Sequence, residues 1–174
     1  MPPLSPEAET ASRFEALFSQ HYVRVARVIG RIVRDRARAE EMAVDVFVKW
    51  RRHPEAHGDG AEGWLYRTAV RSALDAWRRE RRWARLQWAL ATVTGSPRTP
   101  EALHEHERER EQVQATLARL RHRDATALLL WSEDVPYGEI AAAIAVQPSS
   151  VGSLLKRAQL TFRKEYEARY GTRS

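Results

Sequence analysis

The sequence contains no cysteine, which excludes a disulfide framework, a thiolate metal site and a thiol nucleophile. It also lacks any run of about 20 apolar residues, the length that a helix needs to cross a bilayer. The first ten residues, MPPLSPEAET, have neither a basic start nor an apolar core, so they do not predict a secretion signal. We therefore expect a cytoplasmic protein with no segment inserted in a membrane.

The alternating pattern of a β-strand is absent as well, and apolar residues recur at intervals of three and four, which predicts an all-α fold. The first expected helix runs roughly from Ser12 to Arg34. Asp35 can cap a second helix, roughly Ala37 to Arg52. The stretch HPEAHGDG, residues 53–60, contains one proline and two glycines, so it predicts a loop. A third helix is expected from about Ala61 to Arg85 or a little beyond.

The composition changes after the third helix, which indicates two small helical domains. TVTGSPRTP, residues 92–100, is rich in turn residues and has no apolar face, so it indicates a connection between two units. In the second unit, Tyr137–Ala145 predicts a short helix, and Pro148 is suited to the first position of a longer one. We predict a first domain over 10–90, a linker over 91–112 and a second domain over 113–172.

The charge balance points to a polyanionic partner. Lysine and arginine total 29 against 23 acidic residues, a net charge of +6, and nucleic acid is the commonest partner of such proteins. Arginine-rich compositions also occur without any binding role. The arrangement of the arginines is therefore more informative than their number.

The third helix carries arginines along one side and an aromatic ring at its loop end. On a helical wheel, one side combines a tryptophan, one acid and five arginines: Trp64, Arg67, Arg71, Asp75, Arg78, Arg82 and Arg85. Such a row matches the spacing of phosphates along a strand, and the ring can stack on an unpaired base. A solvated face in which Asp75 pairs with a neighbouring arginine is the alternative. Repulsion among the arginines favours nucleic acid.

The end of the second unit predicts a helix-turn-helix, from its short helix, tight turn and longer helix. In that motif the start of the second helix enters the major groove. Generic helix pairs have the same pattern. The candidate reading residues are Ser149, Ser150, Ser153, Lys156 and Arg157.

No catalytic or metal-binding pattern is evident. HEHERERE, residues 104–111, is part of a charged stretch that predicts a helix, where His104 and His106 would lie about 200° apart and could not share a metal. The H-E-x-x-H spacing of a helical zinc site is absent. A glycine-rich phosphate loop is absent too. We expect no enzymatic activity, no cofactor and no metal.

Three motifs, in this order along the chain, resemble bacterial RNA polymerase sigma factors of the sigma-70 family, extracytoplasmic-function (ECF) type. The first is the pattern from Asp35 to Phe47, which includes Ala39 and Glu40. The second is GWLYRTAVRSALDAWRRERR, residues 63–82. The third combines Y-x-E-I-A, from Tyr137, with S-V-x-S-x-L-x-R-A, from Ser150. Any one of them is weak evidence, but three with the expected spacing are fairly specific.

The resemblance implies core RNA polymerase and promoter DNA as partners, with an anti-sigma factor as a further possible partner, and it implies no bond chemistry. The second helix would dock on the clamp of the largest polymerase subunit through Glu40, Glu41, Asp45 and Phe47. The third would hold the minus-ten strand through Trp64, Arg67, Arg71, Arg78, Arg79 and Arg82. The last helix would read the minus-thirty-five element.

Some positions depart from the family pattern. Val44 stands where glutamine is usual, and Gly152 and Leu154 stand where lysine and arginine are common, which removes two positive charges from the last helix.

Two other functions remain open. One alternative is a helix-turn-helix regulator that binds duplex DNA without melting it. The other is a helical interaction protein whose basic charge is incidental.

Overall fold

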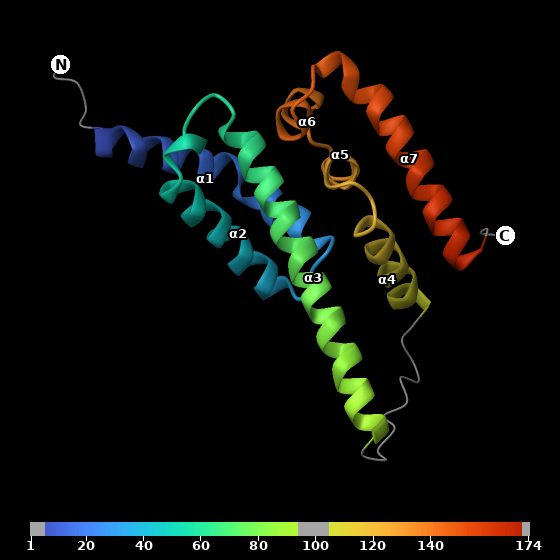
Figure 1. The fold of residues 1–174 in the computed structure, drawn as a ribbon. Coiled ribbons are helices and arrows are strands. Elements are labelled where there is room, and N and C mark those ends of the chain that lie inside the picture. Colours follow the sequence, from blue (N-terminus) through green and yellow to red (C-terminus); the bar gives the residue numbers. More distant parts are fainter. Residues whose placement is uncertain (1–5, 94–104, 172–174) are drawn as a thin grey trace.

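The computed structural model describes residues 6–93 and 105–171, and these contain helices and no strand, as predicted (Figure 1). The helices are α1 (Pro6–Gly30), α2 (Arg36–Arg52), a short 3-10 helix η1 (Pro54–Ala56), α3 (Ala61–Val93), α4 (Glu105–Leu117), α5 (His122–Trp131), α6 (Tyr137–Ile144) and α7 (Pro148–Tyr170).

The first unit packs α1, α2 and α3 around a core of aliphatic and aromatic side chains, including Ile29, Val46, Trp50 and Leu65. Asp35 caps α2 as predicted, because its carboxylate accepts a hydrogen bond from the backbone N–H of Arg38 at 3.2 Å.

Helix α1 ends at Gly30, earlier than the sequence predicts. The chain turns after Gly30, and the backbone N–H groups of Ile32 and Val33 both donate to the carbonyl of Ile29. Both side chains are nevertheless buried. The apolar residues of the sequence therefore keep their helical spacing through the turn, although the backbone is no longer helical there.

The loop 53–60 is attached to the end of α2. The indole Nε1 of Trp50 donates to the carbonyl of Ala56 at 2.9 Å, and a ring nitrogen of His57 lies 2.9 Å from the carbonyl of Trp50. Because Trp50 is fully buried, these bonds connect the loop directly to the core. The loop is thus held at the start of α3.

The second unit contains α4 to α7, with a core that includes Leu130, Ile140, Val151 and Leu155. Pro148 is at the first turn of α7, as predicted, and within the described part of the chain the N-cap residue Gln147 makes no side-chain capping bond. Residues 105–112, which the sequence assigns to the linker, belong to α4. The turn-rich stretch from 94 to 100 lies outside the described residues, and the domain boundaries remain a prediction.

The turn between α6 and α7 contains Ala145 in a left-handed conformation, with φ 53° and ψ 55°. We expect Ala145→Gly to raise stability by about 1 kcal/mol, because a β-carbon is disfavoured there by about 1–2 kcal/mol. Thermal denaturation would show a rise of a few degrees. Ala16→Gly, at an exposed position inside α1, is the control and should lower stability by about 1 kcal/mol. A fall with Ala145→Gly would contradict this account of the turn.

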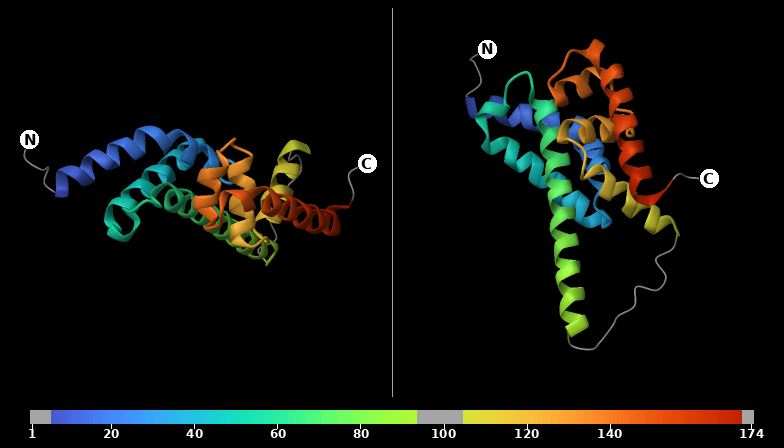
Figure 2. Two further views of the ribbon diagram at one scale, coloured as in Figure 1. Left: turned by 90° about the horizontal axis from the view of Figure 1, so that it is seen from above. Right: turned by 45° about the vertical axis from the view of Figure 1, so that its right-hand side comes forward.

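Helix α3 joins the two units. It contacts α1 and α2 of the first unit and α5 and α6 of the second, and its C-terminal part extends beyond the other helices (Figures 1 and 2). Helix α7 packs on α4, α5 and α6. The helix with the predicted strand-binding arginines therefore has one part covered by the second unit and another that projects away from it.

Candidate nucleic-acid and partner interfaces

The predicted strand-binding arginines divide into two groups along α3. Arg71, Arg79 and Arg82 are exposed. Around Arg82 two large apolar side chains are also exposed, with 62% of Trp83 and 49% of Leu86 accessible to solvent. This part of α3 offers exposed cations and an exposed aromatic ring to a partner, the combination that single-stranded nucleic acid requires.

The other two arginines contact the second unit. Nη1 of Arg67 donates to the carbonyls of Ala142 at 2.8 Å and Ala143 at 3.0 Å, at the end of α6. Nη2 of Arg78 donates to the carbonyl of Ala118 at 2.8 Å. Two of the arginines that are predicted to contact DNA thus bond to backbone carbonyls of the same chain in this conformation.

Arg78 also forms the ion pair that the solvated-face alternative predicts. Its Nη1 lies 3.0 Å from a carboxylate oxygen of Asp75. Both groups are well exposed to solvent, so the pair contributes at most about 1 kcal/mol to stability. The pair partly neutralises one arginine, and Arg79 and Arg82 remain exposed cations.

Trp64 lies half-buried at the start of α3, beside the loop, where its ring centroid is 5.7 Å from that of His53. His53 is itself on the loop. The predicted placement of an aromatic side chain at the loop end of the arginine row is confirmed. The loop and this ring form one surface with the first turn of α3.

A histidine of α5 faces the arginines of α3. Burial lowers the pKa of His122, and the nearby cations Arg71 and Arg78 lower it further. His122 is therefore neutral at neutral pH and adds no charge to this face. Burial also lowers the pKa of Arg67, and the neighbouring cation Arg71 lowers it further. An arginine nevertheless remains charged at neutral pH.

Two of the three predicted acidic contacts of α2 lie on its outer surface, and the third lies at the edge of that surface. Glu41 and Asp45 are exposed, and half-buried Glu40 pairs with Arg36 at 2.9 Å. Val44, between the acids, is 42% exposed. The surface is thus acidic with an apolar centre, a composition suited to a basic protein partner.

Phe47 is on the buried side of α2, and its predicted role as a contact residue needs correction. Its side chain is completely buried, with its ring 5.0 Å from Phe18 and 6.3 Å from Phe14 between centroids. It cannot reach a partner without unfolding α2. Its role is to fix α2 on α1.

The candidate reading residues lie together on the first turns of α7, and all are exposed: Ser149, Ser150, Ser153, Lys156 and Arg157. Leu154, by contrast, is buried within the second unit, with only 3% of it exposed. The expectation that Leu154 removes a charge from the DNA-facing surface is therefore wrong, because this position belongs to the core. Gly152 is exposed, so its departure remains relevant.

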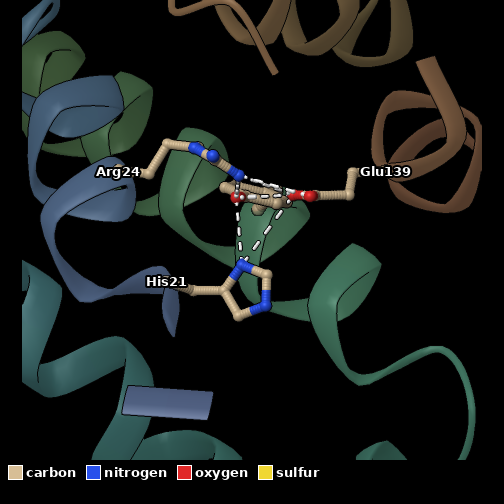
Figure 3. Close-up of polar contacts among 4 residues, drawn as sticks. His21, Arg24 and Glu139 are labelled. Atoms are coloured by element: carbon tan, nitrogen blue, oxygen red, sulfur yellow. Dashed lines mark hydrogen bonds and ion pairs between the residues drawn. The ribbon is translucent and has the colours of Figure 1, made fainter. Parts of the chain in front are cut away.

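A polar cluster that the sequence does not predict joins α1, α3 and α6 (Figure 3). The carboxylate of Glu139 accepts hydrogen bonds from Nη1 of Arg24 at 3.1 and 3.2 Å and from the hydroxyl of Tyr66 at 3.0 Å. Nδ1 of His21 lies 3.2 Å from the same hydroxyl. Glu139 belongs to the Y-x-E-I-A motif, but its partners lie 73 and 115 residues away, so sequence spacing could not identify them.

The proton positions in this cluster follow from its geometry. Burial raises the pKa of Tyr66, so its hydroxyl is protonated and can donate its one hydrogen to Glu139. The hydroxyl oxygen then accepts from Nδ1–H of His21. Burial lowers the pKa of His21, which keeps the ring neutral, and Nε2 is buried with no hydrogen-bond partner among the residues that the structure describes.

No group of three or more side chains suited to hold a metal ion occurs among the residues that the structure describes. Within the same residues, no helix is long and apolar enough to span a membrane. His104 and the side chain of His106, in the HEHERERE stretch, lie outside the described part of the chain.

Comparison with known proteins finds similarity both in the first unit and along most of the chain. Residues 17–83, which run from α1 into α3, match the Sigma-70 region 2 family. The chain is 27% identical over 163 residues to the ECF RNA polymerase sigma factor SigE of Mycolicibacterium smegmatis, which covers 91% of this chain and 63% of that protein. The chain thus spans slightly less than two thirds of this relative's length. Residues 17–83 are thus similar to Sigma-70 region 2, and most of the chain is similar to an ECF sigma factor.

Proposed function

We propose that the protein is a sigma factor that binds core RNA polymerase, recognises promoter DNA and assists strand opening. One observation carries the proposal. The segment that matches Sigma-70 region 2 has an acidic outer surface on α2 and exposed arginines on α3. The name of the SigE relative supports the same function. The protein would act in the cytoplasm, as a binding protein that makes and breaks no covalent bonds.

The arginine face of α3 would hold the melted minus-ten strand. Extruding a base from duplex DNA costs about a few kcal/mol, which stacking and phosphate neutralisation can offset. Trp64 is placed to stack near the loop, and Arg71, Arg79 and Arg82 are exposed to phosphates in this conformation. Arg67 and Arg78 would join them after leaving their carbonyl partners on the second unit.

The acidic surface of α2 would bind the polymerase clamp through Glu40, Glu41 and Asp45. The charge on this surface is opposite to that of a basic clamp, which favours rapid and specific association. Phe47 supports the surface from inside the core. An anti-sigma protein that covers one of these surfaces is the further partner that we propose from the family resemblance.

Helix α7 would read the upstream promoter element. Replacing Lys156 and Arg157 together by alanine should weaken binding to duplex DNA and reduce the slope of log affinity against log salt by about 2, one unit for each phosphate that is no longer neutralised. Fluorescence anisotropy over a salt series measures this. Lys49→Ala with Arg51→Ala, at exposed positions of α2, is the matched control. An unchanged slope in the α7 variant would contradict the assignment.

The alternative of a duplex-binding regulator is not favoured, because it accounts for the helix-turn-helix but not for the match to Sigma-70 region 2. Co-elution with purified core RNA polymerase in size-exclusion chromatography separates the two functions. A sigma factor forms a stoichiometric complex with the core enzyme. Duplex binding without any complex with the core would support the regulator.

A further inference from the structure

Gly152 lies among the candidate reading residues of α7, and the fold does not require a glycine at this position. It is exposed inside a helix, where glycine is less favourable than alanine. Among the described residues, a β-carbon placed on it would meet one atom within 4 Å, Cε2 of Tyr137 at the ordinary contact distance of 3.9 Å. Gly63 of α3 is the opposite case, because its β-carbon would lie only 2.5 Å from the carbonyl oxygen of Ala142. Packing therefore explains Gly63 and gives no reason for Gly152.

The ring of Tyr137 forms one side of the open space at Gly152. Tyr137 is the first residue of α6, which packs on α7, and 48% of it is exposed to solvent. Because position 152 has no side chain, the ring edge and the backbone of α7 leave a notch with room for one carbon-sized group. The notch opens to solvent, since Gly152 is exposed.

The notch adjoins the side of α7 that would face DNA. Ser149 lies three residues before Gly152 and Lys156 four residues after it, so both are its neighbours on the helix surface. Lys156 and Arg157 are exposed and take part in none of the salt bridges found within the described residues. These cations can therefore bind phosphates while the notch lies against the base edges.

The notch suits one chemical group of the major groove. Thymine presents its C5-methyl group there, and proteins read this group by contact with apolar side chains. A methyl group has the size of the β-carbon that Gly152 lacks, and in that place it would pack against the ring of Tyr137. A polar base edge would find no hydrogen-bonding side chain at position 152.

We propose that Gly152 and Tyr137 together read the methyl group of one thymine in the upstream promoter element. Gly152 admits the methyl group, and the ring of Tyr137 packs against it. The inference rests on the proposed function, because it takes α7 as the helix that enters the major groove. It adds a specific base to that function, and a residue of α6 to the reading surface.

Replacing thymine by uracil tests the proposal, because it removes the methyl group and leaves the hydrogen-bonding edge of the base unchanged. Duplexes are selected from a randomised pool with the full-length chain, and uracil then replaces each thymine of the selected site in turn. We expect one position at which uracil lowers the affinity by roughly three- to fivefold, the effect of one buried methyl group. Fluorescence anisotropy of labelled duplexes measures the dissociation constants.

Two variants assign this effect to the notch. Gly152→Leu fills the notch at an exposed position, with a residue that forms helices better than glycine. Tyr137→Ala removes the ring. Neither variant should distinguish thymine from uracil at that position, whereas Tyr137→Phe, which keeps the ring, should retain the distinction. Ala168→Leu is the matched control, because it introduces the same side chain at an exposed position about four turns further along α7.

Three results would overturn the proposal. The parent chain selects no sequence from the pool, or no uracil substitution lowers its affinity for the selected site. The third is a distinction between thymine and uracil that persists in both Gly152→Leu and Tyr137→Ala, since the methyl group is then read elsewhere. Failure of the proposed function is seen separately, as the absence of a complex between the parent chain and core RNA polymerase. Failure of this inference alone leaves that complex intact.

Discussion

Removing Arg79 and Arg82 together should reduce open-complex formation by roughly ten- to a hundredfold while leaving polymerase binding unchanged. Both side chains are exposed on α3. A hydrogen bond to a charged group contributes about 1.5–3 kcal/mol, and removing two such bonds to phosphate, discounted for exposure and salt, accounts for this range. Permanganate footprinting of unpaired thymines in the promoter measures the effect.

The matched control removes two exposed arginines outside α3, with Arg108→Ala and Arg121→Ala. The control variant has the same net charge as the α3 variant. An equal reduction of promoter melting in both variants would therefore mean that the effect comes from the total charge of the protein. Unchanged melting in the α3 variant would remove these arginines from the strand-binding site. Arg78→Ala is also expected to reduce melting, but the bond of Arg78 to Ala118 makes that variant alter the contact between the units as well.

Reversing the charge of Asp45 should weaken binding to core polymerase by roughly a hundredfold. Asp45 is exposed on α2, and an arginine there would place like charges opposite each other at a basic clamp, an arrangement that costs about several kcal/mol. Titration of labelled protein with core polymerase gives the dissociation constant. The folded structure should remain intact because the side chain is exposed and belongs to no part of the core.

Glu107→Arg provides the same reversal at an exposed position of α4 and should leave the affinity for core polymerase unchanged. Phe47→Ala is unsuitable as a probe of the interface. It would remove a fully buried ring, at a cost of about 3–5 kcal/mol in stability, and abolish binding through unfolding. An Asp45→Arg variant with the parent's affinity would exclude the acidic surface of α2 as the polymerase contact.

The local elements could be predicted from the sequence because their causes are local. The cap at Asp35, the period of α2 and the position of Pro148 all depend on residues within one or two turns. The burial of Phe47 is also present in the pattern, since it falls on the apolar side of α2 with Ala43, Val46 and Trp50. The wrong role as a polymerase contact came from the position of Phe47 in the motif that resembles sigma factors, and not from its spacing along α2.

The contact between the units could not be predicted in the same way. Glu139 meets Arg24 and Tyr66 from positions 115 and 73 residues away, and no periodicity links them. A glycine inside a helix, such as Gly63, signals only a possible close approach and does not identify the helix that approaches. Which arginines of α3 are exposed and which bond to the second unit therefore required the structure.

The most direct test of the central claim is run-off transcription by purified core RNA polymerase, with and without this protein, on genomic DNA fragments of the source organism. The account predicts specific transcripts that appear only when the protein is added, with unpaired thymines just upstream of each start. Binding to upstream duplex DNA with no complex with the core enzyme and no transcripts would contradict it.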